Sequence, residues 1–189
     1  MQLKNELDIL SIIRQDKWMM DILRAAKQLD LPDWWVCAGF VRSKIWDTLH
    51  HFNRRTPPPD IDVIYFDDRN INESVEKDWE AYLADIIPHI PWSVKNQARM
   101  HLANNTQPYS SSTDAMSKFP ETATALGVKL NNADNLMLAA PHGVDDVIHL
   151  RVRPTDHFAA SKERMVIYKD RMRNKHWKRI WNNLEIDQS

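Results

Sequence analysis

The sequence is poor in cysteine and glycine and has no long apolar run. Cys37 is the one cysteine in 189 residues, which excludes an internal disulfide, a four-cysteine zinc site and a CxxC redox pair. Three glycines are too few for the multi-glycine phosphate loops of P-loop and dinucleotide-binding proteins. No apolar run approaches the roughly 20 residues that cross a bilayer, and polar residues interrupt the N-terminus where a secretory signal would be apolar. We therefore expect a cytoplasmic protein without a membrane span.

Charge is balanced over the whole chain but unevenly distributed along it. The formal net charge of −1 argues against a general polyanion binder. Residues 60–90 carry a net charge of −7, whereas residues 151–180 carry +7. These segments are either solvated faces that partly attract each other or the two walls of a cleft, one acidic and metal-binding, the other basic and phosphate-binding. The ten basic side chains of the second segment also leave nucleic acid open as a minority partner.

Hydrophobic periodicity predicts strands that alternate with helices, which is typical of a mixed α/β or α+β protein. Short apolar or β-branched runs predict strands at 34–38, 60–66, 92–97, 127–130 and 136–140. Helical spacing predicts helices within the first thirty residues and at 41–50, 73–87, 98–103, 110–119, 143–150 and 160–181. Five of the eight tryptophans lie in or beside apolar patterns, and we expect them in the core: Trp18, Trp34, Trp46, Trp177 and Trp181.

Two aspartates at the start of a predicted strand are the main functional signal. Asp60 and Asp62 are two positions apart, so in a strand they share a face, with Cα atoms about 6.6 Å apart. Two adjacent carboxylates repel each other unless a proton or a cation lies between them. Mg²⁺ or Mn²⁺ is the natural partner, because these hard ions take oxygen ligands and leave room for substrate phosphates. Ile61 and Val63 would pack beneath the site.

A strand-to-helix turn precedes this pair. Gly39 lies between a buried strand and a helix, and it would let a ligand approach the backbone. The free N–H groups and the dipole at such a helix start favour a phosphate. Arg42, one turn into the helix, would add a phosphate contact.

The motifs AGFVR and DIDV together resemble the nucleotidyltransferase superfamily of DNA polymerase beta, CCA-adding enzymes and poly(A) polymerases. Bacterial CCA-adding and poly(A) enzymes write the first motif as GGxVRD. The segments AGFVRSKIWD, DIDVIYFD, WSVKNQARMH, FPETATALGVKL and APHGVDD resemble a small bacterial family of predicted nucleotidyltransferases over about residues 34–180. The resemblance implies an α+β protein with a minimal nucleotidyltransferase fold, a mixed sheet flanked by helices. We expect one domain over residues 1–189, with a core at about 34–153 and helical additions at 1–31 and 156–189.

The resemblance also implies a reaction and a set of site residues. A hydroxyl acceptor would attack the α-phosphorus of a nucleoside triphosphate and release pyrophosphate, with two divalent metals about 3.5–4 Å apart. Asp60 and Asp62 would hold the metals, while Gly39, Phe40 and Arg42 would bind the nucleotide. The polar cluster KNQARMH adds two candidate nucleotide-binding cations, Lys95 and Arg99, with polar surface as the alternative.

Several positions depart from the pattern that the resemblance implies. Ala38 replaces the first glycine of GGxVRD and Ser43 replaces its aspartate. Many relatives place a third carboxylate on a following strand, where Ser93 or Lys95 stands here. Three acids are candidates to supply it from elsewhere: Asp67, Asp145 and Asp146.

The departures leave three functional hypotheses. The first is a nucleotidyltransferase with an unidentified acceptor, for which a small molecule or a protein is favoured over RNA. The second is a catalytically weak or inactive nucleotide-binding module that regulates a partner, and the replacement of an acid by Ser93 favours it. The third is a use as a toxin or antitoxin that acts on a protein or tRNA.

Overall fold

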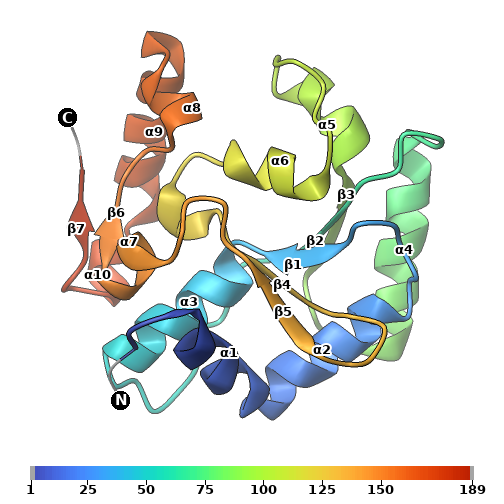
Figure 1. Ribbon diagram of the computed structural model, residues 1–189, viewed down its shortest axis with the longest axis horizontal. Coiled ribbons are helices and arrows are strands. Elements are labelled where there is room, and N and C mark those ends of the chain that lie inside the picture. Colours follow the sequence, from blue (N-terminus) through green and yellow to red (C-terminus); the bar gives the residue numbers. More distant parts are fainter. Residues whose placement is uncertain (1–2, 188–189) are drawn as a thin grey trace.

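A mixed five-stranded sheet organises the chain in the computed structural model, which describes residues 3–187. The strand order is β3-β2-β1-β4-β5 (Figure 1). β1 is antiparallel to both neighbours, β2 and β3 are parallel, and β4 and β5 form an antiparallel pair. The strand bounds are Trp35–Cys37 for β1, Ile61–Tyr65 for β2, Trp92–Asn96 for β3, Gly127–Leu130 for β4 and Leu136–Ala139 for β5. This arrangement confirms the predicted α+β class with a mixed sheet.

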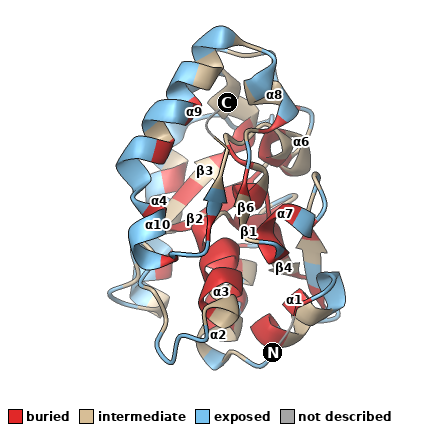
Figure 2. Cartoon of the chain, turned by 90° about the vertical axis from the view of Figure 1, so that its left-hand side faces the viewer, coloured by how far each residue is buried: buried red, intermediate tan, exposed pale blue. Residues whose placement is uncertain are grey.

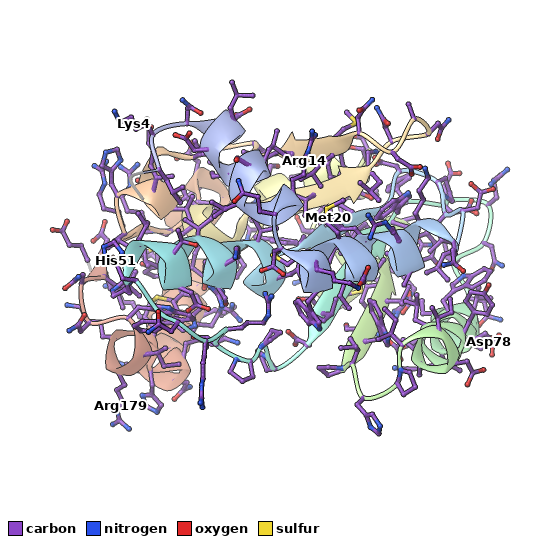
Figure 3. The ribbon with its side chains drawn as sticks, turned by 90° about the horizontal axis from the view of Figure 1, so that it is seen from below. Lys4, Arg14, Met20, His51, Asp78 and Arg179 are labelled. Carbon is purple, nitrogen blue, oxygen red and sulfur yellow. The ribbon has the colours of Figure 1, made fainter. Side chains whose placement is uncertain are left out.

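Helices cover both faces of this sheet. The helices are α1 (Glu6–Arg14), α2 (Lys17–Lys27), α3 (Gly39–Leu49), α4 (Glu73–Ile86), α5 (Gln97–Ala103), α6 (Ser112–Ser117), η1 (Thr122–Thr124), α7 (Asp145–Ile148), α8 (Asp156–Ala159), α9 (Lys162–Lys175) and α10 (Trp177–Ile180). In Figure 1, α1, α2 and α3 lie below the sheet, α5 and α6 lie above it, and α9 stands to one side. Figure 3, seen from below, shows α2 and α3 lying along the same face, with His51 just beyond the end of α3.

Strand alternation sends apolar side chains into two separate clusters. Val36, Ile61 and Val63 face the large cluster between the sheet and α1–α3, and all three are fully buried. Trp35, Cys37 and Ile64 face the opposite side and pack with Met116 of α6. The period of two in β1 and β2 thus separates a core face from a face that α6 covers only in part.

The tryptophan predictions are confirmed in the part of the chain that the structure describes. Trp34, Trp46, Trp177 and Trp181 are buried, and Trp18 is partly buried against Phe40. The ring of Trp46 meets those of Trp177 and Trp181 edge-on, with centroids 5.5 and 5.0 Å away. Aromatic side chains from α10 and its end therefore pack onto α3, which is buried along most of its length (Figure 2).

The predicted elements match the observed ones closely, with four differences. Asp60 lies just before β2 rather than inside it, and the predicted helix at 41–50 begins at Gly39. The predicted helical region at 160–181 consists of two helices, α9 and α10, and the short helix α8 precedes it. The expected helical addition at 156–189 ends in a strand, since β7 (Glu185–Ile186) pairs in parallel with β6 (Arg151–Val152), and residues 188–189 lie outside the described part. Strands of two residues are too short to show any period in a sequence.

Among the described residues, every helix is too short or too polar to cross a membrane.

Candidate active site

Asp60 and Asp62 lie together at the start of β2. Asp62 pairs in register with Cys37 of β1 and with Ser93 of β3, so its side chain shares the sheet face of Ile64 that α6 leaves partly open. Asp60 precedes the strand and is exposed. Ile61 and Val63 pack beneath on the core face, as predicted. Asp62 therefore lines a hollow on this face, and Asp60 lies two residues before it at the surface.

The field around Asp62 disfavours its ionised form. Burial, together with the negative charge of Asp60, raises the pKa of Asp62 to about 6, although a hydrogen bond with Ser93 and the charges of Lys175 and Arg42 oppose the shift. A cation placed between the two carboxylates would remove that penalty. The donor set of two carboxylates fits Mg²⁺ or Mn²⁺, which prefer oxygen ligands.

The turn between β1 and α3 has a positive φ at Ala38, the position of the first glycine in the motif GGxVRD. Ala38 has φ +54° and ψ −115°, a positive-φ conformation outside the left-handed helical region that is unfavourable for alanine. Its carbonyl accepts the N–H of Arg42 at 3.0 Å, the first hydrogen bond of α3. A Cβ on Gly39 would meet only the Arg42 guanidinium, 3.6 Å away, so no backbone crowds this position. Gly39 itself is buried, and an added side chain there would meet Arg42 first.

Arg42 does not project into open solvent as a simple phosphate contact would. Its side chain is buried, and the guanidinium carbon lies 4.4 Å from the Trp177 ring centroid and 5.1 Å from that of Trp46. Burial lowers the pKa of Arg42 to about 10, while the charge of Glu121 opposes this shift, so the side chain stays cationic at neutral pH. The guanidinium thus stacks on tryptophan rings, and the phosphate contact of Arg42 stays a prediction.

Phe40 is likewise turned away from the site. Its ring is buried and packs on Trp18, with centroids 5.8 Å apart. The ring therefore belongs to the large core cluster. The role of Phe40 in nucleotide binding stays a prediction.

The two cationic side chains of the KNQARMH segment point to different parts of the molecule. Lys95 lines the hollow with Asp62, and its Nζ lies 3.4 Å from Glu76 and 3.5 Å from Glu80. Arg99 points to α4 instead, where its Nε and Nη2 each donate to Glu76 at 2.7 Å. Arg99 is therefore not among the residues that line the hollow, and its role as a nucleotide ligand stays a prediction.

Of the three acids proposed to complete the site from elsewhere, two form ion pairs and one is exposed. Asp67 pairs with Arg69, Asp146 pairs with Arg153, and Asp145 is exposed at the start of α7. Within residues 3–187, no group of three or more His, Cys, Asp or Glu side chains is arranged to hold a metal ion. Ser93 stands on β3 directly beside Asp62, at the position where a third carboxylate was expected.

A cleft of about 470 Å³ extends from Asp62 across this face. Its walls come from β1, β2 and β3, from α5 and α6, and from α8 and α9, which gather in the upper half of Figure 1. The charged side chains that line it are four cations and Asp62; the cations are Lys95, Lys118, Arg164 and Arg171. Aromatic rings of Tyr109, Phe119 and Phe158 provide apolar surface. The volume, the rings and the positive charge suit an anionic ligand with a flat apolar part.

Two residues near the site escaped the sequence interpretation. Glu121 is fully buried and pairs with Arg171 of α9, with Oε1 2.8 Å from Nε. The sequence signal was present, because Glu121 is the one acid in the segment FPETATALGVKL. Arg171 stood out only as one of many basic residues, since nothing local distinguished it from its neighbours.

Comparisons with known proteins agree with this geometry. A family model described as nucleotidyltransferase matches residues 24–186. The chain belongs to this nucleotidyltransferase family. A comparison with curated proteins gives no match.

Several solved structures resemble this nucleotidyltransferase in fold. The chain is 38% identical to a protein whose NMR structure is described as revealing a CCA-adding enzyme head domain, with a TM-score of 0.88 and coverage of 99% of this chain and 98% of that one. It is 16% identical to the Thermotoga maritima CCA-adding enzyme in complex with tRNA-CCA, with a TM-score of 0.53 and coverage of 100% and 44%. A CCA-adding enzyme in complex with ATP is 15% identical, with a TM-score of 0.54 and coverage of 99% and 44%. The nucleotidyltransferase chain thus spans less than half the length of these two enzymes.

Family and fold together support nucleotidyl transfer as the general reaction. They confirm the resemblance that the motifs AGFVR and DIDV suggested, and they confirm the predicted α+β nucleotidyltransferase fold.

Proposed function

We propose that this nucleotidyltransferase transfers a nucleoside monophosphate from a nucleoside triphosphate to a hydroxyl acceptor and releases pyrophosphate. The observation that supports the proposal is the position of Asp62, which lines a cationic cleft and carries the field of the neighbouring Asp60. Under the proposal, the acid pair and the start of α3 would hold a polyphosphate with its bound cation.

Each part of the site has a chemical task under this proposal. Asp60 and Asp62 would hold Mg²⁺ or Mn²⁺, which when bound supplies charge neutralisation at the phosphates and a lower pKa for the attacking hydroxyl. The N–H groups at the start of α3 would orient the polyphosphate, and the buried charge of Arg42 would strengthen their field. The protein would otherwise contribute mainly by position and electrostatics.

For the acceptor, we favour a small molecule or a protein hydroxyl over RNA. The cleft has the volume of a small-molecule site. The relatives described in complex with tRNA extend well beyond the part that this chain matches. RNA is nevertheless included among the acceptors to be tested.

The proposal predicts pyrophosphate release that depends on the acid pair. Wild-type protein with Mg²⁺ or Mn²⁺, each nucleoside triphosphate and pools of small-molecule, protein or RNA acceptors should release pyrophosphate. Asp60→Asn and Asp62→Asn should each lower the rate by roughly 10²-fold or more, since each removes a metal ligand without changing side-chain volume.

Asp68→Asn is the matched control. Asp68 is an exposed acid just beyond the other end of β2, so its substitution should leave the rate unchanged. Equal rates in wild type, Asp60→Asn and Asp62→Asn would contradict the proposed site.

Ser93 supports a second candidate function, a regulatory nucleotide-binding module with weak or no catalysis. Ser93 hydrogen-bonds Asp62 from the position where many relatives carry an acid. On this view wild type binds nucleotide without turnover, and Ser93→Asp should create or raise pyrophosphate release by supplying the third carboxylate. Turnover in wild type that Ser93→Asp does not improve would reject the module.

A further inference from the structure

A fully buried carboxylate lies behind the cleft. Glu121, just before η1, is fully buried, and its Oε2 accepts the Thr124 hydroxyl at 2.8 Å. Its Oε1 accepts Nε of Arg171 at 2.8 Å, and Nη2 of the same guanidinium lies 3.4 Å from Oε2. An isolated buried carboxylate would be very costly, so Glu121 depends on Arg171 and fixes its orientation.

Arg171 has hydrogen-bonding capacity that Glu121 does not use. The Nε–Nη2 edge of the guanidinium faces Glu121, which leaves the edge that carries Nη1 pointing elsewhere. The side chain is 35% exposed and lines the cleft that contains Asp62. It also lines an adjoining hollow whose wall includes Lys175. The arginine is therefore anchored on one edge while its side chain remains partly exposed in the cleft.

Lys175 continues this cationic face along α9. Arg171 and Lys175 are four residues apart, so they project from the same side of the helix. Lys175 forms no ion pair among residues 3–187, and its charge acts on Asp62 across the hollow. Arg173, two residues from each, faces a different hollow with Tyr168 and pairs with Asp170. Arg171 thus lines the cleft with Asp62, and Lys175 lies beside Arg171 in the adjoining hollow.

We propose that Arg171, oriented by Glu121, and Lys175 bind the polyphosphate of the nucleotide from the side of α9, opposite the carboxylates of Asp60 and Asp62. This inference rests on the proposed function. Arg171 and Lys175 touch the substrate, and Glu121 is a positioning residue. Other ion pairs of α9, such as that of Arg173, remain structural.

The two cations have a defined task in the reaction. A bond forms between the acceptor oxygen and the α-phosphorus, and the bond from that phosphorus to the bridging oxygen breaks. The electron pair leaves with pyrophosphate, and the hydroxyl proton passes to solvent. Negative charge thus grows on the leaving group, where a fixed guanidinium stabilises it without reorganisation.

Calorimetric titrations with ATP, inorganic tripolyphosphate and AMP test the contact, with and without Mg²⁺. Arg171→Gln should weaken ATP and tripolyphosphate binding by roughly tenfold to 100-fold, as expected for a lost charge-assisted contact. AMP binding should change by less than about threefold, because one phosphate does not span the contact. Lys175→Gln should show the same selectivity, and Arg171→Lys should recover part of the loss.

Arg173→Gln is the matched control on the same helix, and it should bind all three ligands as wild type does. Glu121→Gln separates positioning from mere structural support. It should weaken tripolyphosphate binding in protein that remains folded by circular dichroism, and Glu121→Gln with Arg171→Gln should bind no more weakly than Arg171→Gln alone. If Glu121 were only a structural support, Glu121→Gln would lower the melting temperature, and any change in affinity would be the same for ATP, tripolyphosphate and AMP.

The outcomes distinguish this inference from the proposed function. Folded Arg171→Gln and Lys175→Gln variants that bind tripolyphosphate like wild type would overturn the inference, even if wild type releases pyrophosphate. Selective loss in these variants without any turnover in wild type would support the inference and count against the proposed transferase reaction. A wild-type protein that binds neither ATP nor tripolyphosphate would overturn both.

Discussion

At the scale of single residues, Ala38 carries strain at the point where the ligand is expected to approach. Its φ of +54° costs an L-residue about 1–2 kcal/mol relative to glycine. The relatives' motif GGxVRD has glycine there, which adopts this conformation freely. The alanine therefore keeps the backbone path of the turn at the expense of stability.

Ala38→Gly should stabilise the protein by up to about 1 kcal/mol. Relief of strain outweighs the larger entropy of glycine in the unfolded chain, which costs about 0.4–1 kcal/mol. Urea unfolding monitored by tryptophan fluorescence measures the difference. Ala84→Gly, at an exposed position inside α4, is the control and should destabilise by about 1 kcal/mol. Loss of stability in both variants would show that the turn is unstrained.

At the scale of elements, one buried acid joins three of them beside the cleft. Glu76 of α4 is fully buried and accepts the backbone N–H of Asn96 at 2.9 Å, at the end of β3. It also accepts two hydrogen bonds from Arg99 of α5. Burial alone would raise the pKa of Glu76, but the bonds from Arg99 and Asn96 outweigh it and hold the pKa below its usual value. Glu76 thus fixes the strand that carries Ser93 and Lys95.

Glu76→Gln should destabilise the protein by about 3 kcal/mol at pH 7, because it leaves Arg99 without its buried partner. A lowered pKa means that the ionised acid stabilises the fold above its ordinary pKa and that this contribution is lost as pH falls through the folded value. The difference between wild type and variant should therefore shrink below about pH 4. Chemical unfolding at several pH values measures it.

Glu73→Gln is the control for this network. Glu73 also contacts Arg99, at 3.2 Å, but it is 65% exposed, so its loss should cost less than about 1 kcal/mol. Equal costs for both substitutions, or a constant difference from pH 7 to pH 3, would contradict the role assigned to Glu76.

At the scale of the whole molecule, short-range patterns predicted the sheet and the place of the acid pair. Short apolar or β-branched runs in DIDVIYF and WSVKN indicated the strands, and the register places Ser93 rather than Lys95 beside Asp62. The directions of long cationic side chains were not predictable. Arg42 stacks on Trp177 and Arg99 pairs with Glu76, partners 135 and 23 residues away that no local period reveals.

Long-range pairing also explains what the sequence interpretation missed. Glu121 and Arg171 are 50 positions apart, and their pairing depends on how α9 packs against the rest of the chain. The short β6–β7 pair likewise depends on the return of the C-terminal segment to residues 151–152. Residues that touch only after folding leave little trace in composition or spacing.

The central claim is that Asp60 and Asp62 together bind a divalent cation. The most direct test is a titration of Mn²⁺ into the protein in the presence of a non-hydrolysable ATP analogue, in which electron paramagnetic resonance measures the free Mn²⁺. The account predicts that Asp60→Asn and Asp62→Asn each weaken Mn²⁺ binding by roughly tenfold or more, whereas Asp68→Asn binds as wild type does. Unchanged Mn²⁺ affinity in the folded Asp60→Asn and Asp62→Asn proteins would contradict it.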